Sequence, residues 1–262
     1  MSEWVAARKI EKANLFWTEE CQGITTDGSH FFISTNAPHP YKGVHKFSLD
    51  LRSHLGHTRL PLTAGGHPGD LDWDNMRGHG YVPCEPFGRI WIIDEGLNTV
   101  KIASLGDGGV NPQGEWLPWC AVNPVDGLLY SSRFDADRIY AYDPDRNFRW
   151  VRTVHLPQFV RKIQGGFFSP NGLLYLASDH TRRIICHDLG RRGLRGGSLA
   201  KVVGTTPIPV SSGWEEVEGL ALCHLAWSQG ADTWVIALVL DNDANTDDVF
   251  LHFYSVPDPT AI

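Results

Sequence analysis

The sequence predicts an all-β protein, a five-bladed β-propeller with four antiparallel strands in each blade. Three observations predict this fold. One pattern recurs five times along the 262 residues, at a spacing of about 50 residues. Each copy holds short aromatic and β-branched runs separated by turn residues, and none shows the period of a long amphipathic helix. Units of this length with four short strands are typical of propeller blades.

The five copies begin near residues 22, 67, 118, 164 and 217. Three of them carry a tight-turn signal between their first two strands, at Asp27-Gly28, Asp126-Gly127 and Asn171-Gly172. Such pairs favour hairpins because both turn positions readily adopt positive φ. A third run and a weaker fourth run follow in the first four copies (GVHKFSLD and HTRLPL in the first). Each of these copies therefore predicts a four-stranded antiparallel sheet.

The fifth copy ends with its third run, VFLHFYSV, and lacks a fourth. The N-terminal stretch EWVAARKIE, residues 3–11, belongs to no copy of its own. We expect residues 3–11 to supply the outer strand of the last blade and to close the ring, because closure protects a sheet edge that would otherwise stay unpaired. The whole chain, residues 1–262, is then expected to form one propeller domain.

Three segments resemble the repeat units of known propellers: WLPWCAVNPVDGLLYSS, IQGGFFSPNGLLYLAS and RIYAYDPDRNFRWVRTV. They are similar to units of the broad group that includes YncE-like, NHL-like and strictosidine-synthase-like proteins. The resemblance covers nearly the whole chain at the level of the pattern. It implies blades, and it implies no particular chemistry.

The charge and the apolar content of the chain limit the classes of molecule that it is expected to bind. The net charge of −7 and the pI near 5.9 lack the basic footprint that nucleic-acid binding needs, so no nucleic-acid partner is expected. No apolar run is long enough to span a bilayer, so no membrane partner is expected. We expect a small molecule as ligand or substrate, and the sequence is compatible with a monomer. The five cysteines are odd in number, form no CxxC pair and follow no secretory segment, which predicts reduced thiols in a cytoplasmic protein without structural zinc.

Strand direction predicts where a functional site lies. In an antiparallel meander, the start of each innermost strand and the end of the second strand share one face, and innermost strands line the central tunnel. Polar or aromatic residues occupy these places in every copy. The innermost strands contribute Gln22, His67, Asp70, Trp119, Gln164, Glu216 and Glu218, and the second strands contribute Glu85, Arg133, Asp179 and His180. We expect these side chains to surround the tunnel mouth.

Residue chemistry suggests roles at this mouth. Clustered carboxylates must share a proton, bind a cation or pair with an arginine, so we expect catalytic roles for His67, Asp70, Glu218 and Arg133. Neighbouring polar and aromatic groups are expected to bind substrate: Gln22, Trp119, Gln164, Glu85, Asp179 and His180. A divalent metal is a further expectation, with the ligands His67, Asp70, Glu216 and Glu218. Oxygen ligands favour calcium or magnesium, while an imidazole leaves room for zinc or manganese. The structural alternative is that these polar groups only form hydrogen bonds with the crowded backbones near the axis or with ordered water in the tunnel.

Two functions remain open at this stage. The first is a small-molecule enzyme at the tunnel mouth, either hydrolytic like a lactonase or esterase, or working by acid–base chemistry, with or without a divalent metal. The second is a non-catalytic propeller that binds a ligand or a protein. The sequence has no GxSxG, HExxH or P-loop motif, and propellers serve both kinds of function. The density of His, Asp and Glu at the mouth favours the enzyme.

Overall fold

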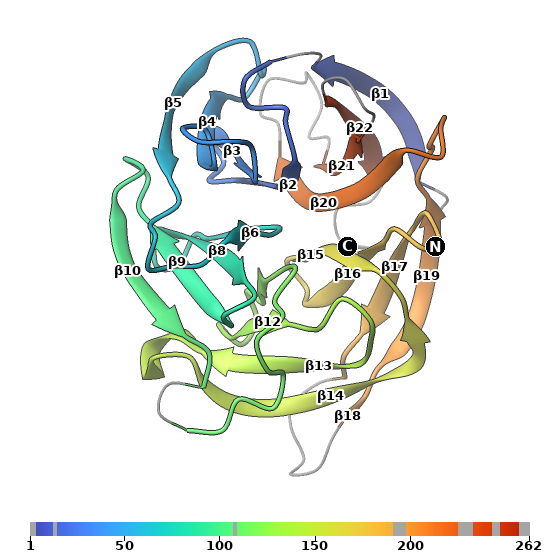
Figure 1. Ribbon diagram of the computed structural model, residues 1–262. Helices are drawn as coiled ribbons and strands as arrows, with labels where there is room; N and C mark the ends of the chain where they lie inside the picture. The colour runs from blue at the N-terminus through green and yellow to red at the C-terminus, as the bar shows by residue number, and fades with distance from the viewer. Residues whose placement is uncertain are drawn as a thin grey trace.

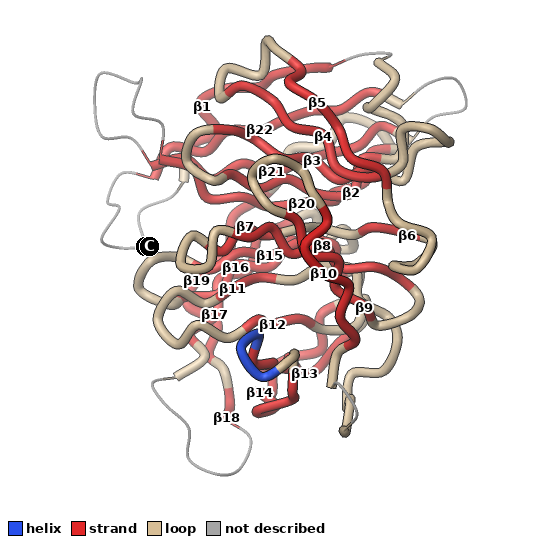
Figure 2. Tube along the Cα trace, turned by 90° about the vertical axis from the view of Figure 1, so that its left-hand side faces the viewer, coloured by secondary structure: helices blue, strands red, loops and turns tan. Residues whose placement is uncertain are grey.

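The computed structural model confirms the five-bladed β-propeller. It describes residues 4–12, 15–106, 109–190, 198–224, 233–242 and 247–256. Five antiparallel sheets stand around one axis, with the innermost strands near the centre and the fourth strands at the rim (Figure 1). Figure 2 shows the same ring from the side, almost entirely as strands and loops.

Blade 1 shows how sequence and burial shape a blade. Its strands, from the axis outward, are β2 (Cys21–Thr26), β3 (His30–Thr35), β4 (Gly43–Ser48) and β5 (His54–Arg59). The predicted turn at Asp27-Gly28 joins the first two: Gly28 has a φ of 87°, and the Asp27 carboxylate accepts hydrogen bonds from the backbone N–H groups of Ser29 and His30. β3 is buried along almost its whole length, whereas β5 is largely exposed because it lies at the rim.

Blade 2 has an interrupted innermost strand. The two pieces are followed by three longer strands, and the five elements are β6 (His67–Pro68), β7 (Asp72–Asp74), β8 (His79–Glu85), β9 (Arg89–Ile93) and β10 (Thr99–Ser104). Between β6 and β7 the chain leaves its own sheet. The Asp70 N–H donates to the Pro118 carbonyl over 2.8 Å, and the Cys120 N–H donates to the Asp70 carbonyl over 3.1 Å. The backbone of Asp70 is therefore bonded to the segment that enters blade 3.

Blades 3 and 4 are joined by one short pair of strands in addition to their packed side chains. Blade 3 contains β11 (Ala121–Val122), β12 (Leu129–Ser131), β13 (Ala136–Asp143), the 3-10 turn η1 (Pro144–Arg146) and β14 (Arg149–Val160). Blade 4 contains β15 (Ile163–Phe168), β16 (Leu173–Ser178), β17 (Arg183–Asp188) and β19 (Lys201–Pro207). The short strand β18 (Ser198–Leu199) pairs in parallel with β14, at the outer edge of blade 3. The run SLAKVVG thus serves two blades, although its sequence reads as one strand of the fourth copy.

Blade 5 contains the closure of the ring. It consists of β20 (Glu215–His224), β21 (Thr233–Asp241), β22 (Asp248–Val256) and β1 (Val5–Lys12). β1 lies antiparallel to β22, with Val5 opposite Ser255 and Lys12 opposite Val249 (Figure 1). This confirms closure by the N-terminal strand; residue 3 lies outside the described residues.

The blades pack through apolar side chains. In the part of the chain that the structure describes, one buried apolar cluster lies at each of the five interfaces between blades. Between blades 1 and 2, for example, Phe32 stacks on Trp73 with ring centres 4.8 Å apart. These interfaces fix the starts of the innermost strands relative to one another. No helix among the described residues is long and apolar enough to cross a membrane.

Candidate functional site

One end of the tunnel opens into a cavity of about 450 Å³, here called the mouth cavity. The innermost strands β2, β6, β15 and β20 begin around it, and the second strands β8 and β21 end there. Its lining combines acids, amides, one histidine and a few apolar groups: Glu20, Gln22, His67, Glu85, Trp116, Phe134, Gln164, Glu216, Glu218, Leu240 and Asn242. The meander geometry predicted from the sequence thus places a polar cavity at this face.

Irregular strand pairing turns three of these side chains toward the axis. The pairing of innermost and second strands shifts register at Gln22 in β2, at Gln164 in β15 and at Glu218 in β20. In each case the next residue, a glycine, resumes the pairing. A β-bulge re-aims the side chain of the extra residue. The same device therefore presents an amide or a carboxyl group from three blades.

Glu218 is the most deeply buried acid of the mouth cavity, with 2% of its surface exposed. Its Oε1 accepts a hydrogen bond of 3.0 Å from Nε2 of Gln164. Burial raises the pKa of Glu218 well above its usual range, and the nearby carboxyl groups of Glu216, Asp179 and Glu20 raise it further. The protonated acid is therefore the favoured form of this group.

Glu85 and His67 face each other where β8 ends and β6 begins. They are direct partners across the two strands, and Oε2 of Glu85 lies 3.7 Å from Nδ1 of His67. Oε1 of Glu85 accepts a hydrogen bond of 3.2 Å from the Leu117 N–H. Burial raises the pKa of Glu85 to about 7 and lowers the pKa of His67. Near neutral pH, Glu85 exists in both protonation forms while His67 is neutral.

The opposite wall of the mouth cavity is partly apolar. Phe134 and Leu240 lie beside the polar groups, and Trp116 lines the cavity with 58% of its surface still exposed. An indole held in this way offers a flat surface to a ligand.

Asp70 lies deeper in the tunnel and is fully buried. Its carboxylate accepts backbone hydrogen bonds of 3.0 Å from Ile24, 3.0 Å from Gly166 and 3.3 Å from Leu220. These three donors belong to blades 1, 4 and 5. Burial raises the pKa of Asp70, while the three N–H groups act in the opposite direction. One carboxyl group therefore connects three innermost strands at the axis.

Glycines make this crowding at the axis compatible with the fold. A Cβ atom on Gly23 would lie 2.4 Å from Cα of Asp70, and one on Gly219 would lie 2.7 Å from Cα of Gly23. The glycines that directly follow Gln22 and Glu218 are thus required by backbones that meet around Asp70. Asp70 does not line the mouth cavity, and its geometry supports a structural role.

The other expected site residues lie outside the mouth cavity. Trp119 is fully buried and donates from Nε1 to the Ser132 hydroxyl over 2.9 Å. Asp179 pairs with Lys162 over 3.0 Å and with Arg182. His180 is exposed at the end of the second strand of blade 4.

Arg133 also lies apart from His67. Its Nε donates to the Gln113 carbonyl over 2.6 Å, and the side chain lines a separate depression together with Asp135 and Asp137. The predicted mouth residues therefore divide into two sets. Those that line the cavity are Gln22, His67, Glu85, Gln164, Glu216 and Glu218, and those that do not are Asp70, Trp119, Arg133, Asp179 and His180.

The predicted metal ligands do not form a compact set. Among the described residues, only one group of three or more His, Cys, Asp or Glu side chains brings its ligand atoms within 4.8 Å of one another. That group is His45, His54 and His57, on the outer strands of blade 1, and it could hold a metal ion. His67, Asp70, Glu216 and Glu218 are not brought together in this way.

The sequence places Trp116 near the start of an innermost strand, where it is expected to stack on a ligand. Sequence reasoning missed four other residues that line the mouth cavity: Glu20, Phe134, Leu240 and Asn242. A signal for Glu20 was present, because it precedes Gln22 by two positions just as Glu216 precedes Glu218. Asn242 follows β21 directly and donates to Glu216 over 3.5 Å. Both residues could have been placed at the mouth by comparing equivalent positions in the five copies of the repeat.

Comparison with solved structures supports the fold. Glutaminyl cyclase from Myxococcus xanthus superimposes with a TM-score of 0.63 at 16% identity, covering 97% of both chains. Virginiamycin B lyase from Staphylococcus aureus gives a TM-score of 0.50 at 14% identity, covering 96% of this chain and 89% of the lyase. No family model matches the chain, and no curated protein sequence matches it. The chain is thus a five-bladed β-propeller, and at these identities the similarity establishes the fold alone.

Proposed function

We propose that the protein is an enzyme that binds a small molecule in the mouth cavity and transfers protons through Glu85 and His67. The observation that carries this proposal is their pairing. A carboxyl group with a pKa of about 7 lies 3.7 Å from an imidazole nitrogen that is buried and has no hydrogen-bond partner. A pKa near the working pH suits a general acid or base. The separation exceeds a hydrogen bond, as is common before a substrate closes the site.

The two groups have complementary tasks. Protonated Glu85 donates its proton to a leaving group or to a carbonyl oxygen. Neutral His67 accepts a proton from the attacking atom or from carbon. Protonated Glu218 and the Gln164 amide hold polar atoms of the substrate, and Trp116 covers an apolar part of it.

The reaction that fits best is an intramolecular one, a cyclisation or an elimination. The similar structures include a glutaminyl cyclase and a virginiamycin B lyase, and acid–base groups suffice for both kinds of reaction. Hydrolysis of a lactone or ester is the second form of the proposal, with water as the attacking group. A divalent metal would be a third form, in which the metal makes a bound water acidic; it would have to draw His67, Glu216 and Glu218 closer together than they lie in this structure.

A substrate panel tests the proposal. The probes are peptides with N-terminal glutamine, virginiamycin B, and simple lactones and esters. Mass spectrometry in ¹⁸O-labelled water separates the forms, because hydrolysis incorporates the label while cyclisation and elimination do not. Chelator treatment tests the metal-assisted form.

Matched variants assign the residues. We expect Glu85→Gln and His67→Ala to lose turnover while still unfolding in one cooperative thermal transition, so that the loss does not come from misfolding. Glu95→Gln, which alters an exposed acid, should keep full turnover. Turnover that survives in both site variants would refute the proposed roles. Tight binding of a probe without turnover, unchanged in Glu85→Gln, would establish the non-catalytic propeller instead.

A further inference from the structure

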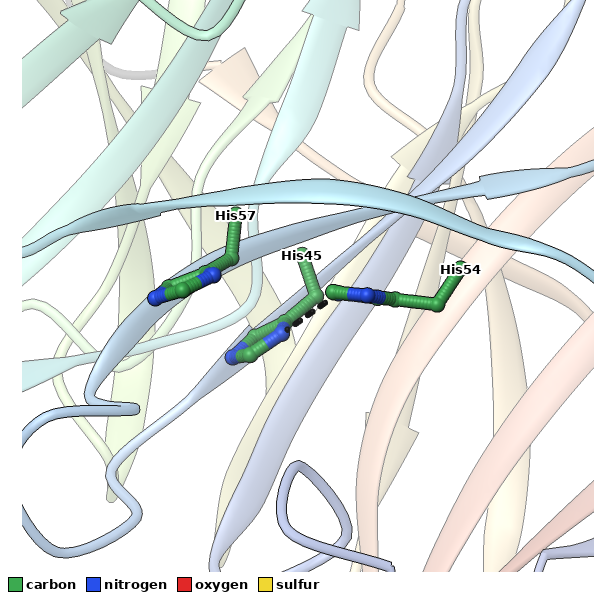
Figure 3. Close-up of side chains that lie close together, drawn as sticks. All are labelled: His45, His54 and His57. Atoms are coloured by element: carbon green, nitrogen blue, oxygen red, sulfur yellow. Dashed lines mark hydrogen bonds between the residues drawn. The ribbon is translucent and has the colours of Figure 1, made fainter.

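The outer part of blade 1 carries a cluster of three histidines that the mouth cavity does not use (Figure 3). His45 lies on β4, and His54 and His57 lie on β5. His45 is the direct cross-strand partner of His57. One ligand nitrogen from each ring can be chosen so that all three lie within 4.8 Å of one another.

An irregularity in the sheet creates this cluster. Residues three apart on a regular strand point to opposite faces, so His54 and His57 would normally diverge. Here the pairing shifts between Lys46 and Phe47: Lys46 faces Gly56, while Phe47 faces His54. Leu55 is the extra residue of this bulge. The bulge brings His54 to the same face as His57 and His45.

The hydrogen bonding of His45 leaves one nitrogen ready to bind a cation. Its Nε2 lies 2.8 Å from the Tyr41 carbonyl, which can only accept, so Nε2 must carry the proton. Nδ1 is then an unprotonated lone-pair donor, and it lies 3.1 Å from Nε2 of His54. A metal-binding histidine commonly donates its other N–H to a backbone carbonyl in this way, which fixes the ring and its tautomer. His45 is fully buried, so this orientation is held by the fold.

The surroundings fit a metal bound by imidazole. The His57 ring stacks on that of His45 with centres 5.1 Å apart, and Phe16 covers His54 edge-on at 5.2 Å. Neutral imidazoles favour zinc, copper and nickel, whereas calcium and magnesium prefer oxygen.

We propose that His45, His54 and His57 bind one divalent late transition metal, of the class of zinc, with a fourth position left for water or an external ligand. Ligand nitrogens around a tetrahedral zinc lie about 3.4 Å apart, given zinc–nitrogen bonds near 2.1 Å. Nδ1 of His45 and Nε2 of His54 lie near this separation, at 3.1 Å, and metal binding would bring in the solvent-accessible side chain of His57 by rotation. The site is independent of the acid–base chemistry proposed for the mouth cavity.

Titration of the metal-free, tag-free protein with zinc chloride by calorimetry tests this site. We expect one equivalent of zinc to bind with micromolar or tighter affinity, and cobalt to show the intense absorption of a tetrahedral complex. Calcium and magnesium should not bind there. His54→Ala and His57→Ala should each weaken zinc binding by at least about tenfold. Both alter solvent-accessible side chains, so unfolding in the presence of chelator should match that of the wild type.

The matched control is His155→Ala. His155 is an exposed histidine on β14, the outer strand of blade 3, and it lies outside the cluster. Its loss should leave zinc affinity and stoichiometry unchanged. Absence of zinc binding by the wild type at micromolar concentration would overturn the proposal. Equal binding by the wild type and both cluster variants would overturn it as well.

Discussion

Gln164 of blade 4 donates a hydrogen bond of 3.0 Å to the buried carboxyl group of Glu218 in blade 5. Both residues are the extra residue of a bulge at the start of an innermost strand. The bond therefore joins equivalent positions of neighbouring blades and holds the acid at the wall of the mouth cavity.

Replacing the acid of this pair tests its part in the proposed reaction. Glu218→Gln keeps the shape of the side chain and removes the acidic O–H that we propose holds a polar atom of the substrate. Because burial favours the neutral form of the wild-type acid, the fold should not depend on its charge. We expect turnover to fall by about 100-fold, with unfolding temperature unchanged, as measured by initial rates and circular dichroism. Wild-type rates in this variant would show that Glu218 lines the cavity without taking part in the reaction.

The raised pKa of Glu85 predicts a pH dependence of stability. Its folded pKa is about 7, whereas an unperturbed glutamate has about 4.3. Between these values the folded state holds more protons than the unfolded state, so the free energy of unfolding falls as pH rises. The loss from this group amounts to roughly 3 kcal/mol across that window.

Glu85→Gln should remove that dependence. Denaturant unfolding at pH 4, 5.5 and 7.5 would show the variant gaining stability relative to the wild type as pH rises. Glu95→Gln provides the control, because the exposed Glu95 side chain should add no such slope. Parallel stability curves for wild type and Glu85→Gln would show that the carboxyl group has an ordinary pKa.

Removing the carboxylate at the axis should damage the whole ring. Asp70→Ala leaves three buried N–H groups without an acceptor, and each costs about 1–3 kcal/mol. Asp70→Asn turns an NH₂ group toward some of the same donors, so it should also destabilise. Denaturant titration of both variants measures this, with Asp137→Asn as an exposed control. A loss below about 1 kcal/mol in Asp70→Ala would contradict the structural role of Asp70.

Deleting residues 1–12 should open the ring. The deletion exposes the hydrogen-bonding edge of β22 and removes the stacking of Trp4 on Tyr175. An exposed strand edge promotes aggregation. We expect a large fall in unfolding temperature and higher oligomers by size-exclusion chromatography with light scattering. A truncated monomer that melts within a degree or two of the intact protein would contradict closure by β1.

The five cysteines should be unreactive in the native state. All five are free and buried, and burial raises the pKa of each thiol. Ellman's reagent should therefore label none until denaturant is added, and all five afterwards. Rapid labelling of one native thiol would show that its strand opens.

The sequence predicted the blades because each blade repeats the same local signals. The turn at Asp27-Gly28 and the missing fourth strand after VFLHFYSV can both be read without knowledge of distant contacts. The histidine cluster is harder to predict in this way. His45, His54 and His57 meet only because of a bulge at Leu55. The neighbouring Gly56 is a local signal of a bulge, but it does not indicate which side chains the bulge brings together.

Some residues expected around the tunnel mouth do not line the mouth cavity, for a related reason. Asp70 follows an interruption of its innermost strand, where the chain turns toward the axis and bonds to the segment after Pro118. Counting along the repeat places such a residue at the mouth, although its carboxylate lies deeper, among glycines of three blades. Trp119 has the position of a mouth residue too, but its large apolar ring is stabilised more by burial between blades than by solvent.

The closing strand also determines when the last blade can form during synthesis of the chain. β1 is made before every other strand of the propeller, and its partner β22 follows about 250 residues later. At a synthesis rate of 5–20 residues per second, the β1 segment waits on the order of 10–50 s before its pairing partner exists. The basic residues Arg8, Lys9 and Lys12 keep this nascent stretch from being a purely apolar strand during the wait. Blades 1 to 4 can assemble in order as they emerge. The last blade is completed only when both β1 and β22 have been made.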